Sequence, residues 1–168
     1  MKIGVCGTGR MGSSIARRLM SVGHDVAVWN RNPAKMVPLT EAGARAFASP
    51  AELVENCEAV IVMLLNDTAS DAVYRGPNGI LNAALEGRLV IDMSTVRPDT
   101  MRAVGISISQ QGAAFVECPV GGSVAPRKRA SCLPWWVANR PILHAQDLFW
   151  SSCAAASSMS ARSVRVRQ

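Results

Sequence analysis

The chain has 168 residues, which is enough for one domain with a sizeable hydrophobic core and a further segment. Its longest apolar run, residues 59–65, is far too short to cross a membrane, and five cysteines without a C-x-x-C pair favour a reduced cytoplasmic protein over a disulfide framework. The net charge of +6 lies entirely at one end, because residues 1–126 hold 11 basic and 11 acidic side chains, whereas residues 127–168 hold 7 basic side chains and one acid. Two widely separated histidines, His24 and His144, give no metal-site pattern. The composition therefore predicts a neutral domain followed by a basic tail.

The first predicted element is a strand that runs into a glycine-rich turn. Ile3 and Val5 alternate with small residues as in a buried strand, and Gly7, Gly9 and Gly12 follow in a G-x-G-x-x-G pattern. In a dinucleotide-binding fold the first glycine makes the tight turn, the second lets the backbone approach a pyrophosphate, and the third lets the helix pack close to the strand. The pyrophosphate would lie at the helix N-terminus, where free N–H groups and the helix dipole favour anions.

A helix and a second strand complete this unit. Residues 13–22 have apolar side chains at helical spacing, Gly23 is placed to end the helix, and residues 25–29 have the composition of a strand. Strand, glycine turn, helix and strand within about thirty residues make the βαβ unit that the motif requires. This context favours a dinucleotide site over an ordinary glycine-rich turn.

The end of the second strand indicates which dinucleotide binds. An NAD-selective fold places Asp or Glu there, where the carboxylate binds the ribose 2′-hydroxyl. This chain has Asn30 and Arg31 instead, and no carboxylate until Glu41. Because a guanidinium can pair with a 2′-phosphate that a carboxylate would repel, the sequence predicts NADP(H) rather than NAD(H). The alternative is that Arg31 is only a solvated charge in a turn.

The rest of the first 117 residues continues the alternation of strands and helices. Ser49 is a plausible N-cap with Glu52 three residues on, as in a capping box, and Pro38 is expected to shorten or kink its helix. The expected helices are 33–43, 51–56, 66–74 and 98–111, and the expected strands are 44–47, 59–65, 89–93 and 114–117. The alternation predicts an α/β fold, a Rossmann-type doubly wound and mostly parallel sheet with ligands at the carboxyl ends of the strands.

Small polar residues follow two of the predicted strands. Ser94 and Thr95 come after residues 89–93, and residues 119–123 (Pro-Val-Gly-Gly-Ser) come after residues 114–117. Such residues leave room for a ligand and offer hydrogen bonds, although they are also ordinary turn formers. Leu64 and Leu65 are candidates for the nicotinamide side of the cofactor, or else belong to the core.

Four segments together resemble the β-hydroxyacid dehydrogenase family, which includes 3-hydroxyisobutyrate dehydrogenase, tartronate semialdehyde reductase and glyoxylate/succinic semialdehyde reductases. They are residues 7–12, 28–32, 90–96 and 115–123, in the family's order and spacing. The resemblance implies a 6-phosphogluconate dehydrogenase-type NADP-binding domain in residues 1–126. It also implies hydride transfer between NADP(H) and a small β-hydroxyacid or semialdehyde substrate. Members of the family are expected to be homo-oligomers, an expectation that does not extend to this chain.

The resemblance also assigns roles to particular residues. It implies that the first loop holds the pyrophosphate, that Asn30 and Arg31 hold the adenosine end, and that Thr95 lies at the nicotinamide. It places Gly122 and Ser123 at the carboxylate side of the substrate, although family members often have Ser-Gly-Gly where this chain has Gly-Gly-Ser. The first loop consists of Gly7, Thr8, Gly9, Arg10, Met11 and Gly12.

The resemblance ends at residue 126. The family continues with an all-α domain that supplies a catalytic lysine in a G-x-G-x-x-x-K segment, whereas residues 127–168 have one lysine, Lys128, in no such segment. A frame change would explain this difference, since the two TGG codons of Trp135 and Trp136 read one base earlier give Val-Gly, as in the Leu-Val-Gly-Gly-Glu of family members. We therefore expect a frameshifted, poorly ordered tail, no all-α domain and an inactive chain.

Two other functions are compatible with the sequence. One is a cofactor-binding module without turnover. The other is a protein that binds nucleic acid or an anionic membrane through its basic tail. The tail's basic residues form no stripe and no known binding motif, so nucleic-acid and membrane partners are not expected.

Overall fold

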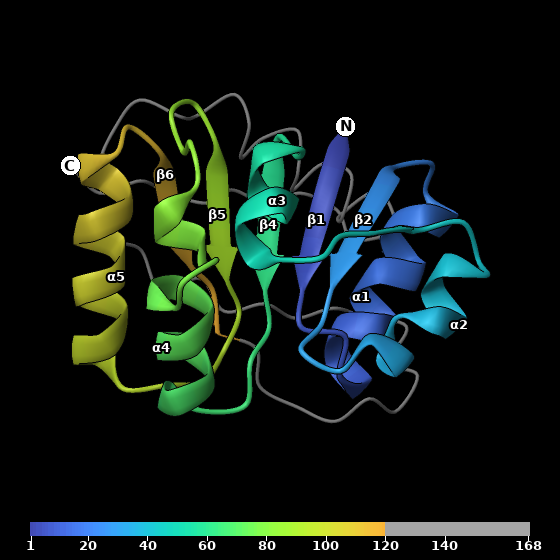
Figure 1. The fold of residues 1–168 in the computed structure, drawn as a ribbon, viewed down its shortest axis with the longest axis horizontal. Helices are drawn as coiled ribbons and strands as arrows, with labels where there is room; N and C mark the ends of the chain where they lie inside the picture. The colour runs from blue at the N-terminus through green and yellow to red at the C-terminus, as the bar shows by residue number, and fades with distance from the viewer. Residues whose placement is uncertain (120–168) are drawn as a thin grey trace, which may run out of the picture.

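The computed structural model describes residues 1–119, which form a parallel six-stranded sheet in the order β3-β2-β1-β4-β5-β6 (Figure 1). Every neighbouring pair of these strands is parallel, so their carboxyl ends meet at one edge. The strands are β1 (Lys2–Cys6), β2 (Asp25–Trp29), β3 (Arg45–Ala46), β4 (Ala59–Val62), β5 (Leu89–Asp92) and β6 (Ala114–Glu117). The predictions for Gly122, Ser123 and residues 127–168 lie outside the described residues.

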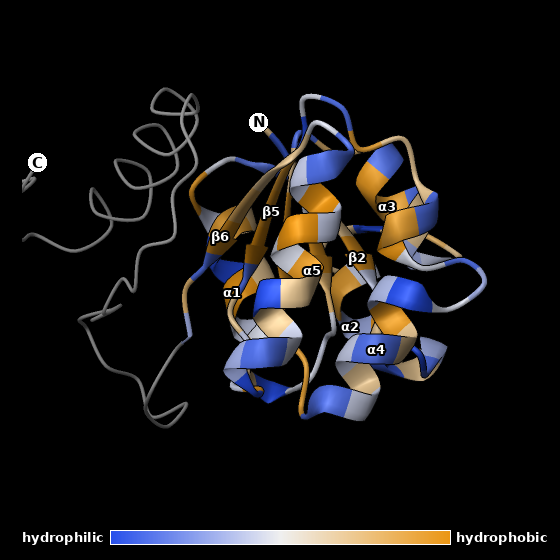
Figure 2. Cartoon of the chain, turned by 90° about the vertical axis from the view of Figure 1, so that its left-hand side faces the viewer, coloured by the Kyte–Doolittle hydropathy of each residue, from blue (hydrophilic) through white to orange (hydrophobic). Residues whose placement is uncertain are grey.

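Helices cover both faces of the sheet, and the sheet divides the core into two hydrophobic clusters. The helical elements are α1 (Arg10–Ser21), η1 (Pro33–Lys35), α2 (Val37–Thr40), α3 (Pro50–Glu55), α4 (Asp67–Arg75), η2 (Ile80–Asn82) and α5 (Pro98–Gln110). One cluster lies under α1 and α2, and the other under α3, α4 and α5. In the hydropathy colouring of Figure 2, hydrophobic residues (orange) occupy the strands and the sides of the helices that face them.

Alternation along each strand divides its side chains between these clusters. In β4, Ala59 and Ile61 face the α1 side, whereas Val60 and Val62 face the α3 side. All four are buried, as expected of a central parallel strand with helices on both faces. The doubly wound α/β fold predicted from the sequence is confirmed.

Several predicted boundaries were wrong by a few residues. The helix expected at residues 13–22 begins already at Arg10, because Gly9 is the N-cap. The helix expected at residues 33–43 is divided into η1 and α2, each with a proline in its first turn, where the missing N–H does no harm. The apolar run at residues 59–65 pairs as a strand only as far as Val62, so Leu64 and Leu65 lie in a loop.

At the start of α3 the predicted N-cap is present, but the predicted capping box is not formed in its usual way. The Ser49 hydroxyl accepts a hydrogen bond from the Glu52 N–H at 3.1 Å, as an N-cap should. The Glu52 carboxylate, however, accepts from the N–H of Ala48 at 3.0 Å rather than from that of Ser49. The cap is therefore a displaced form of the capping box.

Candidate functional site

Two glycines of the first loop are required by the packing of the chain against itself. Gly7 has φ +97°, a left-handed conformation that favours glycine, and its N–H donates to the Trp29 carbonyl at 2.8 Å. A Cβ added to Gly7 would collide with the carbonyl oxygen of Met63, and a Cβ added to Gly12 would collide with that of Gly7. The sharp turn and the close helix–strand approach predicted for these glycines are both present.

Gly9 differs, because the protein itself does not need a glycine there. Its φ and ψ of −68° and −170° suit any residue, and a Cβ added to Gly9 meets no atom within 4 Å. Gly9 is exposed at the N-terminus of α1, where no side chain caps the helix and no acid lies in the first turn. The first-turn amides and the open space above Gly9 therefore fit the pyrophosphate of a dinucleotide.

Asn30 joins the glycine loop to the end of β2. Its Oδ1 accepts a hydrogen bond from the Thr8 N–H at 3.1 Å, and its Nδ2 donates to the Asn32 carbonyl at 3.0 Å. The Thr8 hydroxyl, in turn, donates to the Lys35 carbonyl at 3.3 Å. The residue at the position of the NAD-selective carboxylate is therefore engaged in shaping the loop, a role that the sequence did not reveal.

Basic residues surround this loop. Arg10, Arg31 and Lys35 are exposed, and no ion pair among the described residues involves any of them. The hydrogen bond from the Thr8 hydroxyl to the Lys35 carbonyl places Lys35 beside the glycine loop. Within residues 1–119, this end of the site therefore presents positive charge that no ion pair neutralises.

The loops after β4 and β5 form the other half of the site. Leu64 is half-buried and packs against the cluster under α3, α4 and α5, as its alternative assignment to the core predicts. It also lies against the glycine turn, since its Cδ2 would be 3.2 Å from a Cβ added to Gly7. The Leu65 side chain is 88% exposed, so its alternative assignment to the core is wrong. Ser94 and Thr95 differ in burial. Ser94 is buried, and its hydroxyl accepts a hydrogen bond from the Leu64 N–H at 2.9 Å. Thr95 is exposed and available to a ligand.

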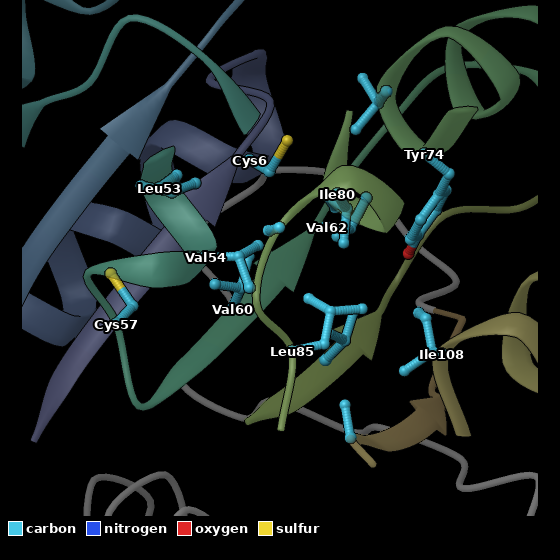
Figure 3. Packing of buried hydrophobic residues seen from close by; sticks show 14 of the residues in the cluster. Cys6, Leu53, Val54, Cys57, Val60, Val62, Tyr74, Ile80, Leu85 and Ile108 are labelled. Carbon is cyan, nitrogen blue, oxygen red and sulfur yellow. The ribbon is translucent and has the colours of Figure 1, made fainter. Parts of the chain in front are cut away.

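A buried polar network lies beneath these loops, and the sequence patterns did not predict it. The Tyr74 hydroxyl donates to Asp92 Oδ2 at 2.7 Å, and the Ser94 N–H donates to Asp92 Oδ1 at 2.7 Å. Figure 3 shows Tyr74 reaching from α4 into the cluster that contains Cys6. The signals were a carboxylate in the apolar segment Leu89–Asp92 and the single tyrosine of the chain.

Burial controls the acid–base properties of this network. Desolvation raises the pKa of Asp92, and the hydrogen bonds from Tyr74 and Ser94 oppose that shift. Desolvation and the nearby Asp92 charge together raise the pKa of the Tyr74 hydroxyl and of the Cys6 thiol. The pKa of Glu117, the partner of Asp92 in the β5–β6 register, is raised by burial and by the Asp92 charge. Tyr74 and Cys6 therefore stay protonated at neutral pH.

Metal-binding clusters and membrane spans are both absent from residues 1–119. This part of the chain has no group of three His, Cys, Asp or Glu side chains arranged to hold a metal ion. None of its helices is both long and apolar enough to be a membrane span.

Comparison with known proteins identifies the class of this domain. The family model for the NAD binding domain of 6-phosphogluconate dehydrogenase matches residues 2–133. Glyoxylate/succinic semialdehyde reductase 1 of Arabidopsis thaliana is 39% identical over 126 residues, which are 75% of this chain and 44% of that protein. The cytokine-like nuclear factor N-PAC of Homo sapiens is 38% identical over 122 residues, which are 73% of this chain and 22% of that protein.

Solved structures agree with these relatives. Psf3 in complex with NADP+ and 2-OPP superposes with a TM-score of 0.69 at 34% identity, over 73% of this chain and 43% of that one. Residues 2–133 are thus an NAD(P)-binding domain of the 6-phosphogluconate dehydrogenase type, a domain of oxidoreductases. The chain belongs to the β-hydroxyacid dehydrogenase family, as the four sequence segments predicted. It spans between 22% and 44% of the length of the relatives described above.

Proposed function

We propose that this chain binds NADP(H) in preference to NAD(H) through the loop Gly7–Gly12 and the residues that follow β2. The observation that supports this choice is the end of β2, where Asn30 is held by Thr8 and Asn32 while Arg31 remains exposed without a carboxylate partner. A 2′-phosphate would meet Arg31 and the nearby Lys35, whereas a bare 2′-hydroxyl would find no acceptor carboxylate there. The similar protein Psf3, whose solved structure is a complex with NADP+, agrees with this proposal.

Fluorescence titration of the full chain with NADPH and NADH tests the cofactor preference. Arg31→Ala should raise the Kd for NADPH about tenfold, the loss of one exposed charge-assisted contact, and leave the Kd for NADH within about twofold. Arg102→Ala serves as the matched control, because Arg102 is an exposed arginine of α5 paired with Asp99. Equal or tighter binding of NADH by the wild-type chain would refute the proposal.

The reaction proposed for the family site is hydride transfer between NADP(H) and a small β-hydroxyacid or semialdehyde. The cofactor supplies or accepts the hydride, and the chain's own loops after β4 and β5 would hold Leu64 and Thr95 at the reacting end. Reduction of a carbonyl also needs a proton donor at the developing alkoxide. The two lysines in the described part of the chain do not meet this need, since Lys2 begins β1 at the opposite edge and Lys35 lies at the adenosine end.

We propose that this 168-residue chain turns over slowly or not at all, because the family's G-x-G-x-x-x-K segment, which supplies the catalytic lysine, does not occur in its sequence. The loss of a general acid costs on the order of 10²–10⁴ in rate. A panel of small semialdehydes with NADPH, compared with a complete reductase of the family under the same conditions, tests the proposal. Turnover within about tenfold of the complete enzyme would show that another residue supplies the proton. Gly122 and Ser123, outside the described residues, remain proposed substrate contacts.

A further inference from the structure

Hydrogen bonds join the loop after β4 to the loop after β5. The Leu64 N–H donates to the Ser94 hydroxyl at 2.9 Å. A second connection lies at the starts of α4 and α5, where Asp67 Oδ1 accepts from the Thr100 hydroxyl at 2.6 Å and from the Arg97 N–H at 3.2 Å. These contacts lower the pKa of Asp67, so the carboxylate stays ionised at neutral pH. The two loops therefore form one hydrogen-bonded unit at the carboxyl edge of the sheet.

Ser94 is held from two sides within this unit. Its hydroxyl accepts a hydrogen bond from the Leu64 N–H, and its own N–H donates to Asp92 Oδ1. The other carboxylate oxygen of Asp92, Oδ2, accepts a hydrogen bond from the Tyr74 hydroxyl. Tyr74 and Asp92 are fully buried and Ser94 is 1% exposed, so water does not compete for these bonds. Because an unpaired polar group is costly at such depth, removal of one partner forces the others to rearrange.

Two residues adjoin this network at the carboxyl edge of the sheet. Leu64 lies against the glycine turn, and Thr95 is the exposed neighbour of Ser94. We propose that Tyr74, Asp92 and Ser94 are positioning residues that hold Leu64 and Thr95 in place for the nicotinamide half of the cofactor. This inference rests on the proposed function, namely that this edge of the sheet binds NADP(H).

A comparison of a whole cofactor with a fragment separates positioning from general stability. NADPH extends over both halves of the site, whereas adenosine 2′,5′-bisphosphate occupies only the half at the end of β2. Tyr74→Phe removes the hydroxyl alone, and Ser94→Ala is a second, smaller change in the same network. Arg88→Met is the control, since Arg88 bonds the carbonyls of Cys57 and Glu55 at the opposite edge of the sheet.

Calorimetric titration of the full chain should show that Tyr74→Phe and Ser94→Ala raise the Kd for NADPH about tenfold. The Kd for adenosine 2′,5′-bisphosphate should stay within about twofold, and Arg88→Met should change the two constants by the same factor. The positioning role would be overturned if the Tyr74 and Ser94 variants raised the Kd for both ligands equally, or changed neither Kd.

Amide hydrogen exchange provides a readout that needs no nucleotide. In Tyr74→Phe the exchange of the Leu64 and Ser94 amides should accelerate at least about tenfold, while that of the β1 amides stays unchanged. Unchanged exchange at Leu64 and Ser94 would overturn the inference, whatever the chain binds. A wild-type chain that binds neither nucleotide would instead refute the proposed function, and the exchange measurement would still decide whether the network holds the loops.

Discussion

Two glycine substitutions in the same loop should have opposite consequences. Gly12→Ala places a methyl group against the backbone oxygen of Gly7, which cannot rotate away, so helix α1 must move off strand β1. Gly9→Ala places the same methyl group in open space, at φ and ψ values that alanine adopts freely. The first change therefore affects folding, and the second affects only what approaches the loop from outside.

The expected free energies follow from these contacts. Overpacking against fixed backbone costs up to about 3 kcal/mol, and the better helix propensity of alanine returns about 1 kcal/mol. Gly12→Ala should thus lower the free energy of unfolding by about 2 kcal/mol, or roughly 8 °C in Tm. For Gly9→Ala, the weaker N-cap and the lower entropy of the unfolded chain nearly cancel, which leaves stability within about 0.5 kcal/mol.

Urea denaturation and NADPH titration of both variants measure the two effects separately. Gly9→Ala should keep the wild-type unfolding midpoint and raise the Kd for NADPH at least tenfold, that is, by about 1.4 kcal/mol. Gly9→Ser would be a useful intermediate, since the new hydroxyl provides a good N-cap but still occupies the open space. Undiminished NADPH binding by a folded Gly9→Ala chain would refute the assignment of the pyrophosphate to the N-terminus of α1.

Two further predictions concern stability alone. Because burial raises the pKa of Asp92, its contribution to stability is full below its unfolded value of about 4 and is lost as pH rises through the raised pKa. The wild-type chain should therefore lose stability relative to Asp92→Asn as the pH rises above about 4 in urea titrations, and a constant difference would contradict the raised pKa. Ser49→Ala should cost about 1 kcal/mol through loss of the α3 N-cap, whereas Ser109→Ala, at an exposed position in α5, should stay within about 0.5 kcal/mol.

Features set by a few consecutive residues were predictable from the sequence. The strand Asp25–Trp29 agrees with its predicted bounds, because alternation of side chains between two faces is a property of the strand itself. The glycine turn was equally predictable, since the backbone conformation at Gly7 is one that other residues rarely adopt. The NAD(P)-binding class and the family follow from these local patterns and their spacing.

Element ends were less predictable, because pairing with other strands decides them. The apolar run at residues 59–65 gives no local sign of where the strand stops, and its partner β5 ends the ladder at Val62 and Asp92. The helix start at Arg10 likewise depends on Gly9 adopting an extended conformation as the N-cap. Composition alone therefore predicts neither the end of β4 nor the start of α1.

The sequence by itself determined the order of strands and helices, the glycine turn and the absence of a carboxylate after β2. Only the tertiary structure decided that Asn30 braces the glycine loop, that Ser94 turns inward while Thr95 faces outward, and that Tyr74 and Asp92 meet beneath them. The physical reason is separation along the chain. A turn or a strand is specified by neighbouring residues, whereas each of these hydrogen bonds joins residues that are 18 to 30 positions apart and meet only when the sheet and its helices have packed.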